Sequence, residues 1–302
     1  MVQSDGYRRQ IIVVRGCFTL KGQWESFSFT KNMKTEIKKQ FPEWCSNMEQ
    51  GTHATILQGD LDSLLGCAIE KLVKGNEINY FYDFSKLYVA DRTNKRKAIG
   101  IDLALHRGKS YCNHVVSIRK DDYVNPLTAN LNVINKIHSN NYFDKYAGST
   151  ALMMWSYYGL PLPESEEGKM LLLCIDSGFK GHYNPDYRKA HSKHLIDMGF
   201  GELIDLLNSK IEFDFELLQG KFKTKANIVL TDKGYLKTQL PLDELSGVFG
   251  LPLELPDKQF TLRNTFTSLK GDTWATPSKD KLENLISFAL TGKRKFKYTT
   301  YA

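Results

Sequence analysis

Alternation of strand-like and helix-like segments is the feature of this sequence that most constrains its fold. The apolar, β-prone run His53–Gln58 is followed by residues 64–73, whose apolar side chains recur at the spacing of an amphipathic helix. Further strand-like runs lie at Ile78–Tyr82, at residues 98–103 and at Val115–Ile118. Strands that alternate with helices are typical of βαβ crossovers, so the sequence predicts an α/β fold with a parallel-sheet core.

The segments on either side of this core have other patterns. Residues 1–50 contain strand-like runs and one short basic helix, which we expect to pack on the core. Residues 226–262 contain three short β-prone runs, and a last helix is expected to open at Ser278 and to end at Gly292. We therefore divide the chain into an N-terminal region (1–50), a core domain (51–205) and a smaller α+β C-terminal domain (206–302).

Two apolar segments between residues 147 and 175 belong to the predicted core domain. Ala147–Tyr158 reads as a buried helix that opens with Gly-Ser-Thr. Met170–Ile175 fits either a strand or a helix, because length alone does not decide between them.

Composition excludes several classes of protein. The five cysteines are odd in number and form no C-x-x-C pair, which argues against a disulfide framework and a zinc ribbon and favours a reducing compartment, the cytoplasm. No apolar run approaches the roughly 18 residues of a membrane span, so no membrane association is expected. The formal net charge of +7 is a mild bias that is compatible with an anionic partner such as nucleic acid.

Candidate metal ligands stand at the ends of successive apolar runs. In open α/β sheets, ligands bind beyond the carboxyl ends of the strands. Several carboxylates at one such edge repel one another strongly without a cation, and carboxylate oxygens with one imidazole suit Mn²⁺ or Mg²⁺. We therefore predict that one or two such ions are bound by Asp60, Asp62, Asp102, His114 and Asp176.

Each of these residues also has a simple structural interpretation. Asp60 and Asp62 precede a helix and fit plain caps, Asp102 and Asp176 fit ordinary loop residues, and His114 fits a structural histidine. The ordered series along the chain is harder to explain in this way than any one of its members.

The motifs that carry this series resemble those of the DHH phosphoesterase superfamily, which includes RecJ-type exonucleases and nanoRNases. The resemblance covers roughly residues 52–180. It rests on an Asp-x-Asp loop between a strand and a helix, an Asp after an apolar strand, a His-containing triplet, and an Asp that follows a helix with a small-residue start. These stand here as ILQGDLDSLLGCAIEKL, IGIDLAL, Asn113-His114-Val115, and YAGSTALMMWSYYG followed by LLLCIDSG.

The resemblance implies a DHH-like core and a metal-dependent phosphohydrolase. Its substrate would be a phosphodiester in single-stranded nucleic acid or in a short or cyclic oligonucleotide. Water activated by Mn²⁺ or Mg²⁺ would cleave the bond, with catalytic roles for Asp62, Asp102 and His114. Oligomeric state is left open.

Three residues depart from the family pattern. Gln58 stands at a position that is usually a His or Asp ligand, and Asn113 and Val115 replace the outer residues of the triplet. They motivate an alternative: a catalytically degenerate family member that binds a nucleotide or a protein partner without hydrolysis.

Other polar clusters allow two interpretations each. His182, His191 and His194 fit either phosphate contacts around the site or a solvated polar loop. Two basic clusters, Asn94–Lys97 and Lys293–Lys297, are candidates for binding a nucleic-acid backbone but are equally consistent with ordinary charged surface. Phe296 and Tyr298 are candidates for stacking on bases.

Overall fold

The computed structural model describes residues 32–302, and the strands expected at residues 11–29 lie outside the described residues. The strands are β1 His53–Gln58, β2 Glu77–Tyr82, β3 Lys86–Val89, β4 Lys97–Ile101, β5 Lys109–Tyr111, β6 Thr128–Ala129, β7 Ile228–Leu230, β8 Leu236–Thr238, β9 Thr261–Asp272, β10 Leu285–Leu290 and β11 Lys295–Tyr301. The helices are α1 Thr35–Lys38, α2 Leu61–Lys74, α3 Leu131–Ile134, α4 Thr150–Tyr158, α5 Glu166–Cys174, α6 Lys180–Tyr183, α7 Pro185–Asp197, α8 Glu202–Ser209, α9 Glu212–Lys221 and α10 Leu242–Phe249. Short 3₁₀ turns lie at Glu43–Cys45, Ser139–Asp144, Ile175–Ser177 and Lys279–Lys281.

A nine-stranded mixed sheet is the centre of the described chain, in the order β10-β11-β9-β3-β2-β1-β4-β5-β6. The run β2-β1-β4-β5-β6 is parallel, whereas β3, β9, β11 and β10 are joined by antiparallel pairings. The predicted α/β class is therefore confirmed. The parallel strands form one half of the sheet, and an antiparallel half continues from its β2 side.

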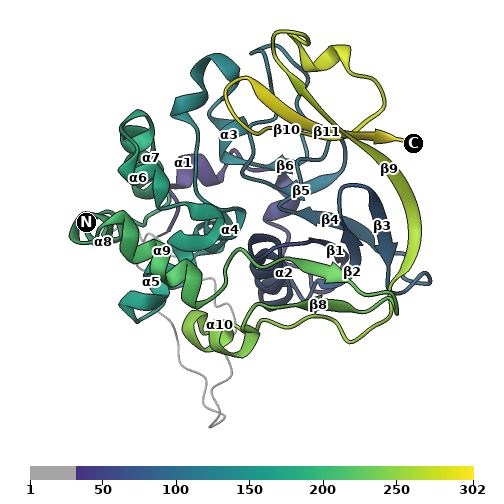
Figure 1. The fold of residues 1–302 in the computed structure, drawn as a ribbon, viewed down its shortest axis with the longest axis horizontal. Coiled ribbons are helices and arrows are strands. Elements are labelled where there is room, and N and C mark those ends of the chain that lie inside the picture. Colours follow the sequence, from purple (N-terminus) through teal and green to yellow (C-terminus); the bar gives the residue numbers. More distant parts are fainter. Residues whose placement is uncertain (1–31) are drawn as a thin grey trace, which may run out of the picture.

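The long strand β9 joins the two halves, and Figure 1 shows it curving from β3 towards β10 and β11. It pairs with β3 at one end and with β11 along most of its length. Isolated bridges then connect β10 to the segments that follow β4 and β5, at Leu105↔Ser287 and Val115↔Leu290. The sheet thus curls until its antiparallel edge touches loops of its parallel half.

One face of the parallel half is covered by α2, and α4 packs against α2. The side chains of β1 alternate, so that Leu57 lies in the main core with α2 while Ile56 lies on the opposite face. Gly66 makes this layering possible: a Cβ there would meet Ile101 Cγ2 at 2.5 Å and Met154 Sδ at 3.1 Å. At this position α2 therefore approaches both β4 and α4 closely, and the three elements meet there.

Two of the expected elements differ from the observed ones, and the structure decides a third that the sequence left open. Val115–Ile118 is not a strand, and the short strand β5 precedes it instead. The helix expected between Ser278 and Gly292 is a 3₁₀ turn followed by β10, because Leu285–Leu290 pairs with β11. Met170–Ile175, which fitted a strand or a helix, belongs mostly to α5, whose N-terminus is capped by the Ser165 side chain.

Residues beyond 205 contribute to both sheets. Strands β7 and β8 form a separate two-stranded sheet, and the Ile228 amide donates a hydrogen bond to the Gly59 carbonyl oxygen. Strands β9, β10 and β11 belong to the nine-stranded sheet. The division of the chain at residue 205 stays a prediction. Within residues 32–302, no helix combines the length and apolar character needed to cross a membrane.

Candidate metal centre

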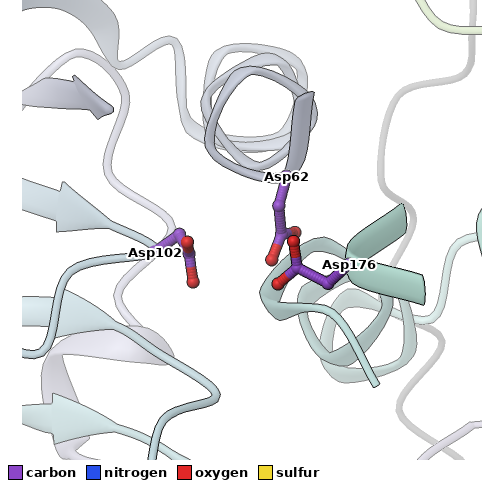
Figure 2. Close-up of side chains that lie close together, drawn as sticks. All are labelled: Asp62, Asp102 and Asp176. Atoms are coloured by element: carbon purple, nitrogen blue, oxygen red, sulfur yellow. The ribbon is translucent and has the colours of Figure 1, made fainter. Parts of the chain in front are cut away.

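Three aspartates from distant parts of the chain gather at one point. Oxygen atoms of Asp62, Asp102 and Asp176 all lie within 4.8 Å of one another. Figure 2 shows Asp62 reaching in from the start of α2, Asp102 from the loop after β4, and Asp176 from the turn that follows α5. Asp62 and Asp102 are buried and Asp176 is exposed, so the cluster opens to solvent on one side. This arrangement is able to hold a metal ion.

Asp62 is fixed by the N-terminus of a second helix. Its Oδ2 and Oδ1 atoms accept hydrogen bonds from the backbone amides of Thr150 (2.8 Å) and Ala151 (2.7 Å), at the start of α4. The Ser149 side chain caps the same helix by accepting from the Leu152 amide. Asp62 is thus not the cap of its own helix. Its orientation depends on the predicted Gly-Ser-Thr start of α4, whose dipole favours a negative charge there.

Asp102 and Asp176 both have left-handed backbone conformations. Their φ angles are +58° and +53°, a region that L-residues rarely adopt and that Asp and Asn tolerate better than most. Asp102 accepts a hydrogen bond of 2.6 Å from the Thr150 hydroxyl group. The sharp backbone turns aim both carboxylates at Asp62, and strain of this kind is often found at functional sites.

His114 and Asp60 lie beside the three-aspartate cluster. His114 Nδ1 is 3.7 Å from Asp102 Oδ1, and about a third of the His114 side chain is exposed. Asp60 is the N-cap of α2: its Oδ1 accepts from the Ser63 amide, and its Oδ2 accepts from Gln58 Nε2. The capping interpretation therefore applies to Asp60, although Asp60 is close enough to Asp176 to sense its charge.

Crowding of like charges perturbs these groups in a consistent direction. Burial, and then the charge of Asp176, raises the pKa of Asp60 to about 6. Burial is also the main reason why the pKa values of Asp62 and Asp102 lie well above the usual range, and the neighbouring carboxylates add to it. Burial lowers the pKa of His114, against an opposing effect of Asp176. Without a cation the site thus favours bound protons on Asp62 and Asp102 and a neutral imidazole on His114.

Two amide groups next to the cluster supply unpaired oxygen atoms. Gln58 donates to Asp60 through Nε2, and Asn113 donates to Asp176 through Nδ2 at 3.3 Å and to the Gly148 carbonyl oxygen at 2.8 Å. Within residues 32–302, Gln58 Oε1 and Asn113 Oδ1 are shielded from solvent and have no hydrogen-bond partner. Buried polar atoms are nearly always paired, and an ion or a water is the usual explanation for exceptions. Amide and carboxylate oxygens are the ligands that Mg²⁺ and Mn²⁺ prefer, so the residues present fit such an ion.

Sequence reasoning missed two residues near the cluster. The charge of Asp176 raises the pKa of Lys145, although burial has the larger, lowering effect. Asn132 holds the loop that carries the site, because its side chain donates to the carbonyl oxygens of Asn113 (2.5 Å) and Tyr146 (3.1 Å). Neither residue lies at a predicted strand end, and no motif marks them, so the sequence offered no signal for either.

The histidines after Asp176 are neither phosphate contacts nor a solvated loop. His182, His191 and His194 are buried among α6, α7 and the preceding segment, and His194 Nε2 lies 3.1 Å from the Asp144 carbonyl oxygen. Phe296 is also buried, in a small core with Phe288, and is not exposed for stacking on bases.

Comparison of the chain with protein-family models, with curated proteins and with solved structures gives no match in any of the three.

Proposed function

We propose that the protein is a metal-dependent phosphohydrolase that cleaves phosphodiester bonds, with Mn²⁺ or Mg²⁺ held by Asp62, Asp102 and Asp176. The observation that carries the proposal is the combination of three converging carboxylates with two unpaired amide oxygens beside them. Within residues 32–302, no lysine or arginine forms an ion pair with any of the three carboxylates, and the side chains that donate hydrogen bonds to them are a hydroxyl group and an amide. The resemblance to DHH phosphoesterases points to the same reaction class.

In the proposed reaction, the residues of the site would have different roles. Asp62 and Asp102 are fixed by α4 and Thr150, and they provide preorganised negative charge. When bound, a divalent cation supplies Lewis acidity and makes water a better nucleophile at neutral pH. His114 is neutral at pH 7, since burial lowers its pKa, so it is able to accept a proton. Burial lowers the pKa of Lys145 and the charge of Asp176 opposes this effect, so Lys145 lies near the cluster and in its charged form would oppose the charge that develops on phosphate oxygens.

The exposed side of the cluster matches a substrate that reaches the site from solvent. Asp176 is exposed, and about a third of His114 is accessible. We propose single-stranded nucleic acid or a short or cyclic oligonucleotide as the substrate, consistent with the net charge of +7. Asp60 acts in this proposal mainly as the cap that holds the α2 start in place.

A panel of substrates tests this function. Purified protein is assayed with Mn²⁺ against single-stranded DNA, RNA, linear dinucleotides, cyclic dinucleotides and pyrophosphate, with EDTA and Asp102→Asn as matched controls. We expect turnover of at least one phosphodiester that both controls abolish. Turnover that persists in EDTA would refute the metal-dependent mechanism.

The alternative, a degenerate protein that binds without hydrolysis, is favoured by Asn113 and Val115 in the triplet. Near-stoichiometric Mn²⁺ binding together with no turnover of any substrate would select this alternative. Absence of both Mn²⁺ binding and turnover would also favour this alternative, and it would rule out the metal-dependent phosphohydrolase.

A further inference from the structure

A basic cavity of about 940 Å³ lies on the sheet face opposite to α2. Its floor is formed by side chains such as Ile56, Tyr80 and Ala98, which belong to a small apolar cluster separate from the main core. Its far wall is formed by β9 and by the start of β10, where the sheet curls back on itself. The curl therefore leaves this face uncovered by a helix and encloses a space of the size that ligand pockets usually have.

The charge of this cavity has one sign. Six of its lining residues are cationic and none is acidic; the cations are Arg92, Lys95, Arg96, Lys97, Arg107 and Arg263. No ion pair to a carboxylate is formed by any of them within the described part of the chain. Like charges gathered without counter-charges raise the local potential and attract polyanions.

The cavity is distinct from the aspartate cluster. Residues 92–96 precede β4 and Lys97 is its first residue, so this segment lies at the amino end of β4, whereas Asp102 follows its carboxyl end. None of the three clustered aspartates, nor His114 or Lys145, lines the cavity. The two features share only the loop after β4, because Leu105, His106 and Arg107 line the cavity.

Aromatic side chains accompany the cations. Tyr301 lines the cavity and is 63% exposed, and its ring lies 6.1 Å from that of Phe266. Arg263 donates to the Tyr80 hydroxyl group at 3.0 Å and covers the Tyr80 ring. The exposed ring is thus Tyr301, which is free to stack on a base. Arg92 donates to the Leu262 carbonyl oxygen and Arg263 to the Tyr80 hydroxyl group, so the phosphate contacts fall mainly to Lys95, Arg96, Lys97 and Arg107.

We propose that this cavity is a binding site for a short single-stranded oligonucleotide, with phosphates on its arginines and lysines and a base on Tyr301. Binding at this site does not depend on the metal centre. An acidic peptide shares the negative charge but has no base to place on Tyr301, so the aromatic contact favours nucleic acid. A mononucleotide would use few of the six cations, so affinity should increase with the length of the strand.

The test is fluorescence polarisation with a labelled single-stranded DNA octamer in EDTA, so that metal-dependent chemistry plays no part. Arg96→Glu combined with Arg107→Glu should weaken binding at least 10-fold. It should also reduce the slope of log affinity against log salt by about 1.4, for two lost phosphate contacts. Tyr301→Ala should weaken binding about 5-fold or more, the loss of one stacked base. All three positions are exposed, so the fold should be retained.

A control variant reverses the same number of positive charges at a site outside the cavity. Lys293→Glu combined with Arg294→Glu reverses two cations in the turn between β10 and β11, outside the cavity, and should leave affinity within about 2-fold. Equal losses in the cavity and control variants would overturn the proposal, because attraction would then be a property of the whole surface. A glutamate-rich peptide of equal charge that displaces the octamer equally well would overturn the ligand class.

The metal centre is tested separately. Asp102→Asn should keep wild-type affinity for the octamer in EDTA even where it abolishes turnover. Loss of binding in Asp102→Asn would place the oligonucleotide at the aspartates and overturn the cavity site. Absence of hydrolysis in every variant would leave the cavity proposal intact while refuting the proposed function.

Discussion

Asp102→Asn should make the metal-free protein more stable while removing most of its response to Mn²⁺. The carboxylate oxygens lie within 4.8 Å of one another, and two unit charges at that distance repel by about 3 kcal/mol at an effective dielectric constant of about 20. Wild-type protein relieves part of this repulsion by binding protons, since the pKa values of Asp62 and Asp102 are raised. We therefore expect neutralisation of Asp102 to stabilise the apo protein by about 1–2 kcal/mol at pH 8, or roughly 2–6 °C.

Asn is the suitable replacement because it keeps the other features of the site. Asn tolerates the left-handed backbone at φ +58°, and the Thr150 hydroxyl group can rotate to pair with the amide. Asp102→Ala removes the same charge but places Ala in that conformation, which costs about 1 kcal/mol or more. Of the two variants, Asp102→Asn should therefore be the more stable.

The assay is thermal unfolding in EDTA and in excess Mn²⁺. A ligand present at 100 times its dissociation constant stabilises the folded state by about 2.7 kcal/mol, and Asp102→Asn should lose most of this gain. Equal Mn²⁺-dependent shifts in wild type and Asp102→Asn would refute the metal role of Asp102. A lower melting temperature of Asp102→Asn in EDTA would refute the argument from crowded charge.

Three further predictions concern neighbouring residues. Asp62→Asn should be less stable than Asp102→Asn in EDTA, by about 1–3 kcal/mol in chemical denaturation, because the new NH₂ group must face one of the amides of Thr150 and Ala151. Lys145→Met should lower the kcat of the proposed hydrolysis about 10–100-fold with a smaller change in Mn²⁺ affinity, as checked by steady-state kinetics and calorimetry. Burial lowers the pKa of His191 from 6.5 to about 4, so the unfolded chain takes up its proton first, and stability is lost as the pH falls from about 6.5 to 4. This loss is about 3 kcal/mol, and the melting temperature of His191→Gln should therefore fall less than that of wild type between pH 7.5 and 5.

The sequence indicated the aspartate cluster best where a ligand directly follows a strand of the parallel sheet. Asp62 and Asp102 follow β1 and β4, which pair directly and in parallel, so their carboxyl ends have to coincide. Asp176 reaches the same place by another route, because it follows helix α5 and not a strand. The position of Asp176 depends on a left-handed turn and on the close approach of Gly178 to the Gly148 Cα atom. Neither feature produces a periodic hydrophobic pattern from which it could be predicted.

The antiparallel half of the sheet was predicted poorly, for reasons of tertiary pairing. Leu285–Leu290 has apolar residues at spacings that suit a helix as well as a strand, and only its pairing with β11 decides between them. In the parallel half, strand β5 was missed for a different reason: it has three residues, one of them charged, so its hydrophobic pattern is too short to detect. The basic cavity results from the curl of the sheet, which depends on contacts between residues 175 and 182 positions apart, Val115 with Leu290 and Leu105 with Ser287.

Pairing of β3 with β9 also sets a limit on how early the sheet can be completed. Lys86 and Thr265 become neighbours only after the intervening chain has been made, which at about 5–20 residues per second takes roughly 10–35 seconds of synthesis. During that interval β3 is an unpaired edge strand next to β2, and such edges promote aggregation. Closure of a loop of this length is also intrinsically slow compared with the local α2–β1 contacts. The parallel half is therefore expected to form first on the ribosome, and yield in cells should depend on how long its open edge is protected.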